Sequence, residues 1–191
     1  MRVFGIDPGS ERTGYGCIET DGSRHRIVLC GTISLRGPLP PGVAAPSSPA
    51  SFADKLLHIH VRLTALLGEA RPDCVAIENL FHAVNVRSAL KLGHARGVAM
   101  LAAVEAGVPV HEYTPAEIKR AVVGFGRAEK QQVGHMVKLL LALDAVPSPH
   151  DAADALAIAI CHIHSSSGRV ADAARNAPAA SRLTTWRAYR P

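Results

Sequence analysis

The sequence predicts an α/β fold in which a mixed sheet is flanked by helices. Short apolar runs alternate with longer segments of helical periodicity over residues 1–167, as in mixed sheets covered on both faces. The first three runs follow one another with tight connections, which indicates an antiparallel meander at the start of a five-stranded sheet. We therefore expect one domain over 1–167 and a disordered, Arg-rich tail over 168–191.

The expected strands are apolar runs bounded by turn residues. Pro8 and Gly9 stop the first run, and Asp21-Gly22 forms a hairpin turn after the second. The fourth run ends in the letters VAIE and is apolar enough to be buried on both faces. The five expected strands are Val3–Asp7, Thr13–Glu19, Arg26–Ser34, Pro72–Glu78 and Val108–Tyr113.

The expected helices follow from apolar spacing and from capping residues. Thr114 and Glu117 form a capping box with proline at the first helical position, so a helix begins there and ends at the loop 124–126. Gly93 and Gly97 mark points where the longest helix can break. The other expected helices are Phe52–Ala70, Ala83–Ala106, Arg127–Leu143 and Ser148–Ser165. Residues 36–50, rich in Pro, Ala, Gly and Ser, are expected to form a flexible insertion.

The composition argues against several classes of protein. No apolar run approaches the roughly 18–20 residues that span a bilayer, and the N-terminus has no signal-peptide pattern. We therefore expect a cytoplasmic protein with no membrane partner. The four cysteines form no CxxC pair and lie in apolar stretches. This pattern disfavours a zinc ribbon or a disulfide framework and favours buried, reduced thiols.

The net charge of +5 is unevenly distributed along the chain. Residues 168–191 hold five Arg and one Asp, and residues 1–81 hold eight basic and eight acidic residues. Residues 82–140 hold eight basic and four acidic residues, whereas 141–167 hold three Asp and no Lys or Arg. A basic middle segment beside carboxylate-bearing segments indicates a surface for a nucleic-acid backbone next to a metal site.

Four carboxylates occupy positions that indicate such a metal site. Asp7 and Glu78 each end an apolar strand, where an unpaired acidic side chain is costly and where such sheets bind ligands. Asp151 and Asp154 are three residues apart on one helical face, among alanines that let the helix approach closely. Carboxylate ligands favour Mg²⁺ or Mn²⁺, and two such ions about 3.5–4 Å apart assist phosphodiester hydrolysis.

Two of the carboxylates also have a structural interpretation. Asp7 can be a turn residue after its strand, and Asp151 can be a charge at a helix N-terminus. Glu78, which stands between AI and NLF, is harder to explain in this way. We favour the metal site because the four residues come from three elements and have no basic neighbour in the sequence. His150 points about 100° away from Asp151 on a helix and ranks below the carboxylates.

An ordered series of motifs resembles the RuvC family of Holliday-junction resolvases. The resemblance covers about residues 1–165, and the length of the series makes it specific. The motifs are DPGSERTGYG at Asp7–Gly16, AIENLF at Ala76–Phe81, SALKLGHARG at Ser88–Gly97, VVGFGRAEKQQV at Val122–Val133 and DAADALAIAICH at Asp151–His162.

The resemblance implies an RNase H-like fold and a homodimeric endonuclease that nicks two opposed strands of a four-way junction. It implies two Mg²⁺ per active site, with Mn²⁺ as an alternative, and a preference for short thymine-containing sites. It also implies the branch-migration proteins RuvA and RuvB as partners in recombinational repair. The metal-ligand positions of the family fall on Asp7, Glu78, Asp151 and Asp154, which become the catalytic residues. The metal preference stays open, because some relatives place His where this chain has an Asp.

The resemblance further implies contacts with DNA. Phe81 matches an aromatic wedge that unstacks bases, although it can also be a core aromatic. Basic residues on the long helix and around the 124–126 loop suit phosphate, with a solvated charged face as the alternative. These residues are Arg87, Lys91, Arg96, Lys119, Arg127 and Lys130. Of these, Lys119 and Lys130 match DNA-binding positions of the family.

Symmetry and chain length bear on the remaining alternatives. A two-fold junction needs two active sites related by a two-fold axis, which a C2 homodimer supplies. The Ala-, Gly- and Leu-rich helix at 83–106 can be the interface or ordinary core. An actin-like ATPase or sugar kinase needs a second Gly-rich phosphate loop and a longer, two-lobed chain. An RNase H-like nuclease acting on RNA would use the same carboxylates, whereas the complete carboxylate set disfavours an inactive junction-binding scaffold.

Overall fold

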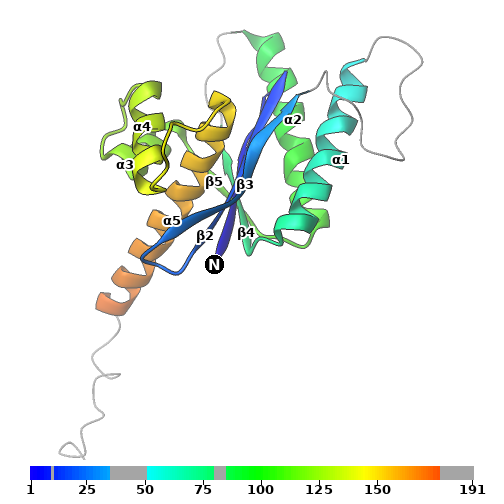
Figure 1. Cartoon of the computed structure of the whole chain (residues 1–191). Coiled ribbons are helices and arrows are strands. Elements are labelled where there is room, and N and C mark those ends of the chain that lie inside the picture. Colours follow the sequence, from blue (N-terminus) through cyan, green and yellow to red (C-terminus); the bar gives the residue numbers. More distant parts are fainter. Residues whose placement is uncertain (10, 35–50, 80–84, 177–191) are drawn as a thin grey trace, which may run out of the picture.

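The computed structural model describes residues 1–9, 11–34, 51–79 and 85–176, with side chains up to residue 166. Its centre is a five-stranded sheet with helices on both faces (Figure 1). The strands are β1 (Arg2–Asp7), β2 (Arg12–Thr20), β3 (His25–Ser34), β4 (Cys74–Glu78) and β5 (Val110–Tyr113). The helices are α1 (Phe52–Ala70), α2 (Val86–Glu105), α3 (Pro115–Val123), α4 (Lys130–Leu140) and α5 (His150–Asn176).

The strand order is β3-β2-β1-β4-β5, which confirms the expected mixed sheet. β1, β2 and β3 form the antiparallel meander, whereas β4 pairs with both β1 and β5 in parallel. Ile6 lies opposite Ile77 in the β1–β4 register. Because the two strands are parallel, their last residues, Asp7 and Glu78, reach the same edge of the sheet.

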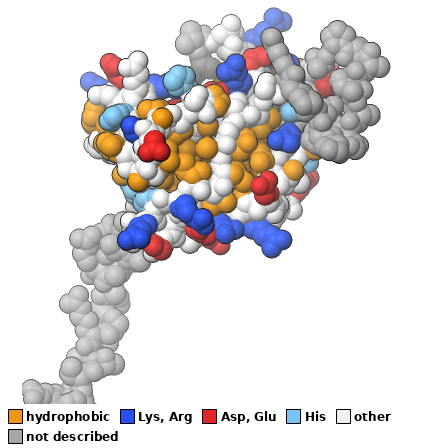
Figure 2. Space-filling model, viewed as in Figure 1, with side chains coloured by type: hydrophobic (Ala, Val, Ile, Leu, Met, Phe, Trp, Pro, Cys, Tyr) orange, Lys and Arg blue, Asp and Glu red, His pale blue; other side chains and the backbone are white. Residues whose placement is uncertain are grey.

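The sheet separates two hydrophobic cores, as the two-residue period of strand side chains requires. On one face Val3, Ile18 and Ala76 pack against residues of α3, α4 and α5. On the other face, Phe4 and Ile77 pack against residues of α1 and α2. Figure 2 shows hydrophobic side chains gathered in the middle of the face on which the edge strand β3 lies.

Two glycines let α5 lie directly on the sheet. A Cβ at Gly5 would lie 2.0 Å from the carbonyl oxygen of Ala155, and a Cβ at Gly14 would lie 2.0 Å from that of Asp151. No side chain other than hydrogen fits in either gap. The glycines therefore bring the first turn of α5 against the meander, beside the end of β1.

Three helices differ from their predicted limits. α5 continues to Asn176, so the expected end at Ser165 is wrong, and the helix includes the start of the segment predicted to be disordered. Ser165–Gly168 are weak helix formers, but the Ala- and Arg-containing residues after them favour a helix. α2 runs without a break through Gly93 and Gly97, and α4 is shorter at both ends than predicted. The expected insertion at 36–50 lies outside the described residues.

Two expectations from composition can be compared with the structure. Cys17, Cys74 and Cys161 are buried and free, as expected, but Cys30 is exposed, so that part of the prediction is wrong. Cys30 lies on β3, an edge strand, where an apolar neighbourhood in the sequence does not guarantee cover. Among the described residues, no helix combines the length and the apolar character needed to cross a membrane.

Candidate functional site

The four predicted carboxylates meet at the carboxyl edge of β1 and β4. Asp7, Asp151 and Asp154 each contribute a carboxylate oxygen, and these oxygens all lie within 4.8 Å of one another. Glu78 lines the same pocket as Asp7 and Asp154, a cavity of about 310 Å³. Two parallel strands and the first turn of α5 therefore bring together residues that are far apart in the sequence.

The rest of the pocket combines an apolar wall with two lysines. The wall comes from α3, α4 and α5 and was not predicted from the sequence. The apolar positions of α3 and α4, such as Ile118 and Val133, are the local signal for this wall. The wall residues are Pro115, Ile118, Val133, Ala157 and Ile158, and the lysines are Lys119 and Lys130.

Burial and mutual repulsion make the carboxylates difficult to ionise together. Burial raises the pKa of Asp7 to about 8, with further contributions from Glu78, Asp154 and Asp151. Burial also raises the pKa of Glu78, and the charge of Asp154 adds to this effect. Lys130 and, for Glu78, Lys119 act in the opposite direction. Several acidic groups are thus held close together where the negative charge is only partly compensated.

Lys130 pairs directly with one carboxylate of the cluster. Its Nζ lies 2.6 Å from Oδ2 of Asp154, and this contact raises the pKa of Lys130. The sequence predicts Lys130 only as a DNA contact, because the α4–α5 packing that joins the two residues leaves no local pattern. Lys119 lines the same pocket from α3, and none of the ion pairs found among the described residues includes it.

The donor set fits hard divalent cations. All four acidic ligands offer oxygen atoms, the donors that Mg²⁺ and Mn²⁺ prefer. The close oxygens of Asp7, Asp151 and Asp154 repel one another unless a cation or protons lie between them. Burial raises the pKa of Asp7 first, and the repulsion from Glu78, Asp154 and Asp151 raises it further. Residues of this chain can therefore hold the expected metal.

The remaining predicted DNA contacts are more dispersed. Arg96 donates to the carbonyl oxygen of Glu78 at 3.2 Å and pairs with Glu112, so it braces the end of β4. Lys91 is exposed, with Nζ 5.8 Å from the ring centroid of Phe52. Of the other predicted DNA contacts, Arg87 and Arg127 are exposed, and Phe81 lies outside the described residues. His150, which ranked below the carboxylates as a metal ligand, is also exposed.

Comparisons with known proteins agree with this geometry. Residues 3–162 match the family described as Crossover junction endodeoxyribonuclease RuvC. A protein of that description from Alkalilimnicola ehrlichii is 50% identical over 163 residues, which cover 85% of this chain and 91% of the relative. Another, from Trichlorobacter lovleyi, is 46% identical over 191 residues and covers both chains fully, including the segments 36–50 and 168–191.

A solved structure shows the same fold. It is described as T. thermophilus RuvC in complex with Holliday junction substrate, and it is 33% identical in sequence to this chain. The TM-score is 0.74, and the likeness covers 88% of this chain and 96% of the other. Together with the strand order and the flanking helices, this likeness confirms the expected RNase H-like fold.

Proposed function

This chain belongs to the RuvC family of crossover junction endodeoxyribonucleases, and from this premise we propose that it resolves Holliday junctions in recombination and DNA repair. The proposed reaction is the symmetric hydrolysis of one phosphodiester bond in each of two opposed strands. The observation that carries the proposal is the convergence of Asp7, Asp151 and Asp154 beside Glu78. These four residues are proposed as the metal ligands and catalytic residues, with two Mg²⁺ as the expected ions and Mn²⁺ as the alternative.

The residues that line the pocket have different roles in the proposed reaction. Two bound divalent ions supply an activated water and stabilise the negative charge of the leaving oxygen. Asp7, on a central strand, is held in place by β2 and β4, and Asp151 and Asp154 by the packing of α5 on glycine. A rigid set of ligands reduces the reorganisation that the reaction requires.

We propose that the two lysines of the pocket bind the phosphates that flank the scissile bond. Lys119 lines the pocket and its charge lowers the pKa of Glu78, so it is suited to a phosphate that approaches the carboxylates. Lys130 has a long side chain with an exposed fraction of 63%, so it can exchange Asp154 for a DNA phosphate. Contacts of this kind add salt-dependent affinity without reading the base sequence. The outlying contacts proposed are Phe81, Arg87, Lys91, Arg96 and Arg127.

We propose a homodimer that meets through α2. Val86, Leu90, Leu101 and Val104 are large apolar residues on this helix that are at least half exposed. They lie on one face at helical spacing, with Gly93 and Gly97 between them and open space beside both glycines. A second copy can therefore approach the helix closely, and the opposite face of α2 packs Ala95 and Ala99 into the core. The further proposals are RuvA and RuvB as partners and the cytoplasm as the location.

The test is cleavage of a synthetic four-way junction in Mg²⁺ or Mn²⁺. We expect paired nicks in opposed strands, with no comparable cleavage of a linear duplex or an RNA–DNA hybrid. Asp7→Asn should reduce the cleavage rate by at least about a hundredfold, because it removes a charged ligand. It should bind the junction with nearly unchanged affinity in a mobility-shift assay. If Asp7→Asn nicked the junction at the normal rate, Asp7 would not be a metal ligand. If the protein cleaved the RNA–DNA hybrid in preference to the junction, it would be an RNA-directed nuclease.

A further inference from the structure

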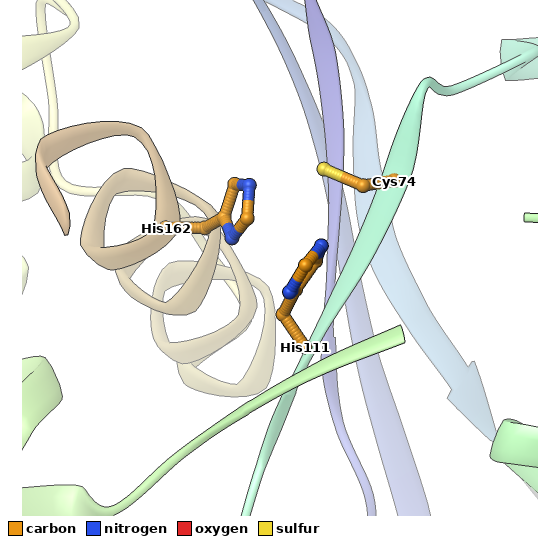
Figure 3. Close-up of side chains that lie close together, drawn as sticks. All are labelled: Cys74, His111 and His162. Carbon is orange, nitrogen blue, oxygen red and sulfur yellow. The ribbon is translucent and has the colours of Figure 1, made fainter. Parts of the chain in front are cut away.

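A second group of ligand-type side chains lies outside the carboxylate pocket. Cys74 at the start of β4, His111 in β5 and His162 in α5 meet between the sheet and the helix (Figure 3). One ligand atom from each residue lies within 4.8 Å of the other two. Cys74 and His162 are only 5% and 4% exposed, and His111 is half-buried. A thiol and two imidazoles thus share one small volume of the interior.

The sheet register explains why these side chains converge. Ala76 lies opposite His111 in the β4–β5 pairing, and Cys74 projects from the same face as Ala76. Because Ala76 carries only a methyl group, no large side chain from β4 stands between Cys74 and His111. The two imidazole rings are 4.5 Å apart between centroids, and Figure 3 shows the sulfur of Cys74 directed toward them.

A tyrosine orients one of the imidazoles. The hydroxyl of Tyr113 lies 2.8 Å from Nδ1 of His162, in the buried layer between β5 and α5. When Nδ1 carries the proton and donates to this hydroxyl, Nε2 presents its lone pair. This is the outer-shell arrangement by which proteins fix a histidine for metal binding.

We propose that Cys74, His111 and His162 form a binding site for a transition-metal ion of the Zn²⁺ class. Thiolate and imidazole ligands suit Zn²⁺, whereas the oxygen ligands of the carboxylate pocket suit Mg²⁺. Three protein ligands leave the fourth tetrahedral position to water, and the thiol proton of Cys74 passes to solvent on binding. Tetrahedral geometry places ligand atoms about 3.3–3.6 Å apart. Rotation of His111, which is half-buried on the edge strand β5, closes the remaining gap.

The ion would act as a cross-link rather than as part of the catalytic site. It joins β4, which carries Glu78, to α5, which carries Asp154, and to the edge strand β5. His162 follows Asp154 by two helical turns, about 12 Å along the axis, so the two sites are separate. An ion that binds only the folded chain stabilises it by mass action.

The test is a Co²⁺ titration of the metal-free, full-length protein in excess Mg²⁺, which occupies the carboxylate site. We expect one equivalent of Co²⁺ to produce tetrahedral visible bands and a near-ultraviolet thiolate-to-cobalt band. Cys74→Ser should lose the thiolate band. His111→Asn should weaken Co²⁺ and Zn²⁺ binding by at least about tenfold, since even the loss of an outer-shell partner weakens binding by that factor.

Matched variants separate this site from others. Cys30→Ser removes an exposed thiol and Asp154→Asn removes a carboxylate of the other site, and both should keep the thiolate band. Zn²⁺ should raise the melting temperature of the unaltered protein by several degrees but not that of His111→Asn, whose circular dichroism verifies its fold. A missing thiolate band in the unaltered protein, its persistence in Cys74→Ser, or unchanged metal affinity in His111→Asn would each overturn the proposal.

Discussion

Asp7 is a buried carboxylate whose ionised form is disfavoured by its surroundings. In the metal-free protein its pKa is raised from 3.8 to about 8, first by burial and then by the neighbouring carboxylates. Between these values the folded protein holds a proton that the unfolded chain releases. The free energy of unfolding therefore falls as the pH rises from about 4 to about 8. The protonated Asp7 contributes its full stabilisation below the pKa of the unfolded chain, and this contribution is lost above the pKa of the folded protein.

Asp7→Asn should remove this pH dependence. In chelator at pH 8, we expect the variant to exceed the unaltered protein in free energy of unfolding by about 1–3 kcal/mol, since one pKa unit is worth about 1.4 kcal/mol. At pH 4 the difference should nearly vanish. Urea denaturation at both pH values measures it. Asp21→Asn, at the exposed hairpin turn, is the control, and its free energy of unfolding should still fall as the pH rises from 4 to 8. If the free energy of unfolding changed with pH equally in Asp7→Asn and in the unaltered protein, Asp7 would not be the source of the pH dependence.

Replacing Lys119 tests whether a single lysine of the pocket binds a DNA phosphate. Lys119→Ala should weaken junction binding by about tenfold and reduce the slope of log affinity against log salt by about 1. The reason is the loss of one charge that releases counterions from the DNA backbone. A salt series of binding assays provides the slope. Arg24→Ala, exposed beyond the far hairpin turn, should leave the slope unchanged. If both variants had equal slopes, Lys119 would not contact phosphate.

At the scale of elements, the contact of α5 with the meander determines where two of the carboxylates lie. Gly14→Ala would place a Cβ 2.0 Å from the carbonyl oxygen of Asp151 and 3.1 Å from its Cβ. We expect α5 to shift, destabilising the fold by about 1–3 kcal/mol and weakening Mg²⁺ binding at the carboxylates. Denaturation and calorimetric Mg²⁺ titration measure the two effects.

Gly68→Ala is the matched control for that substitution. Gly68 is exposed within α1, and no atom would meet its new Cβ within 4 Å. Its replacement should stabilise the protein by about 0.5–1 kcal/mol, because alanine favours the helix. Equal Mg²⁺ affinities for Gly14→Ala and the unaltered protein would show that the close approach of α5 does not position Asp151.

The elements also show which features could be predicted from the sequence. The strands, the capping box of α3 and the placement of Asp7 and Glu78 at strand ends follow local patterns, and the structure agrees with them. Contacts between distant segments were missed: the Lys130–Asp154 pair, and the meeting of Cys74 with two histidines. They depend on how β4, β5, α4 and α5 pack, and no sequence interval encodes that packing.

At the scale of the whole molecule, the symmetry of the substrate must be matched by the symmetry of the protein. One described copy carries one cluster of four carboxylates, whereas symmetric resolution requires two cuts. The apolar face of α2 lies opposite its buried alanines, so joining two copies there leaves each core intact. A two-fold axis through this contact would relate the two active sites.

Leu101→Asp should therefore uncouple the two cuts, one in each of the opposed strands. Leu101 is 50% exposed on α2, and a charge there would be desolvated in a dimer but hydrated in a monomer. We expect the dimer dissociation constant, measured by sedimentation velocity, to rise at least about a hundredfold. On a cruciform plasmid the variant should accumulate nicked circles, because the second cut is no longer coupled to the first, whereas the unaltered protein should give linear product. Leu139→Asp, on an α4 residue with 58% exposure, carries the same new charge and should remain dimeric and make linear product. A Leu101→Asp variant that stays dimeric would place the interface on another face of the molecule, and a monomer that still gave linear product would separate paired cleavage from dimerisation.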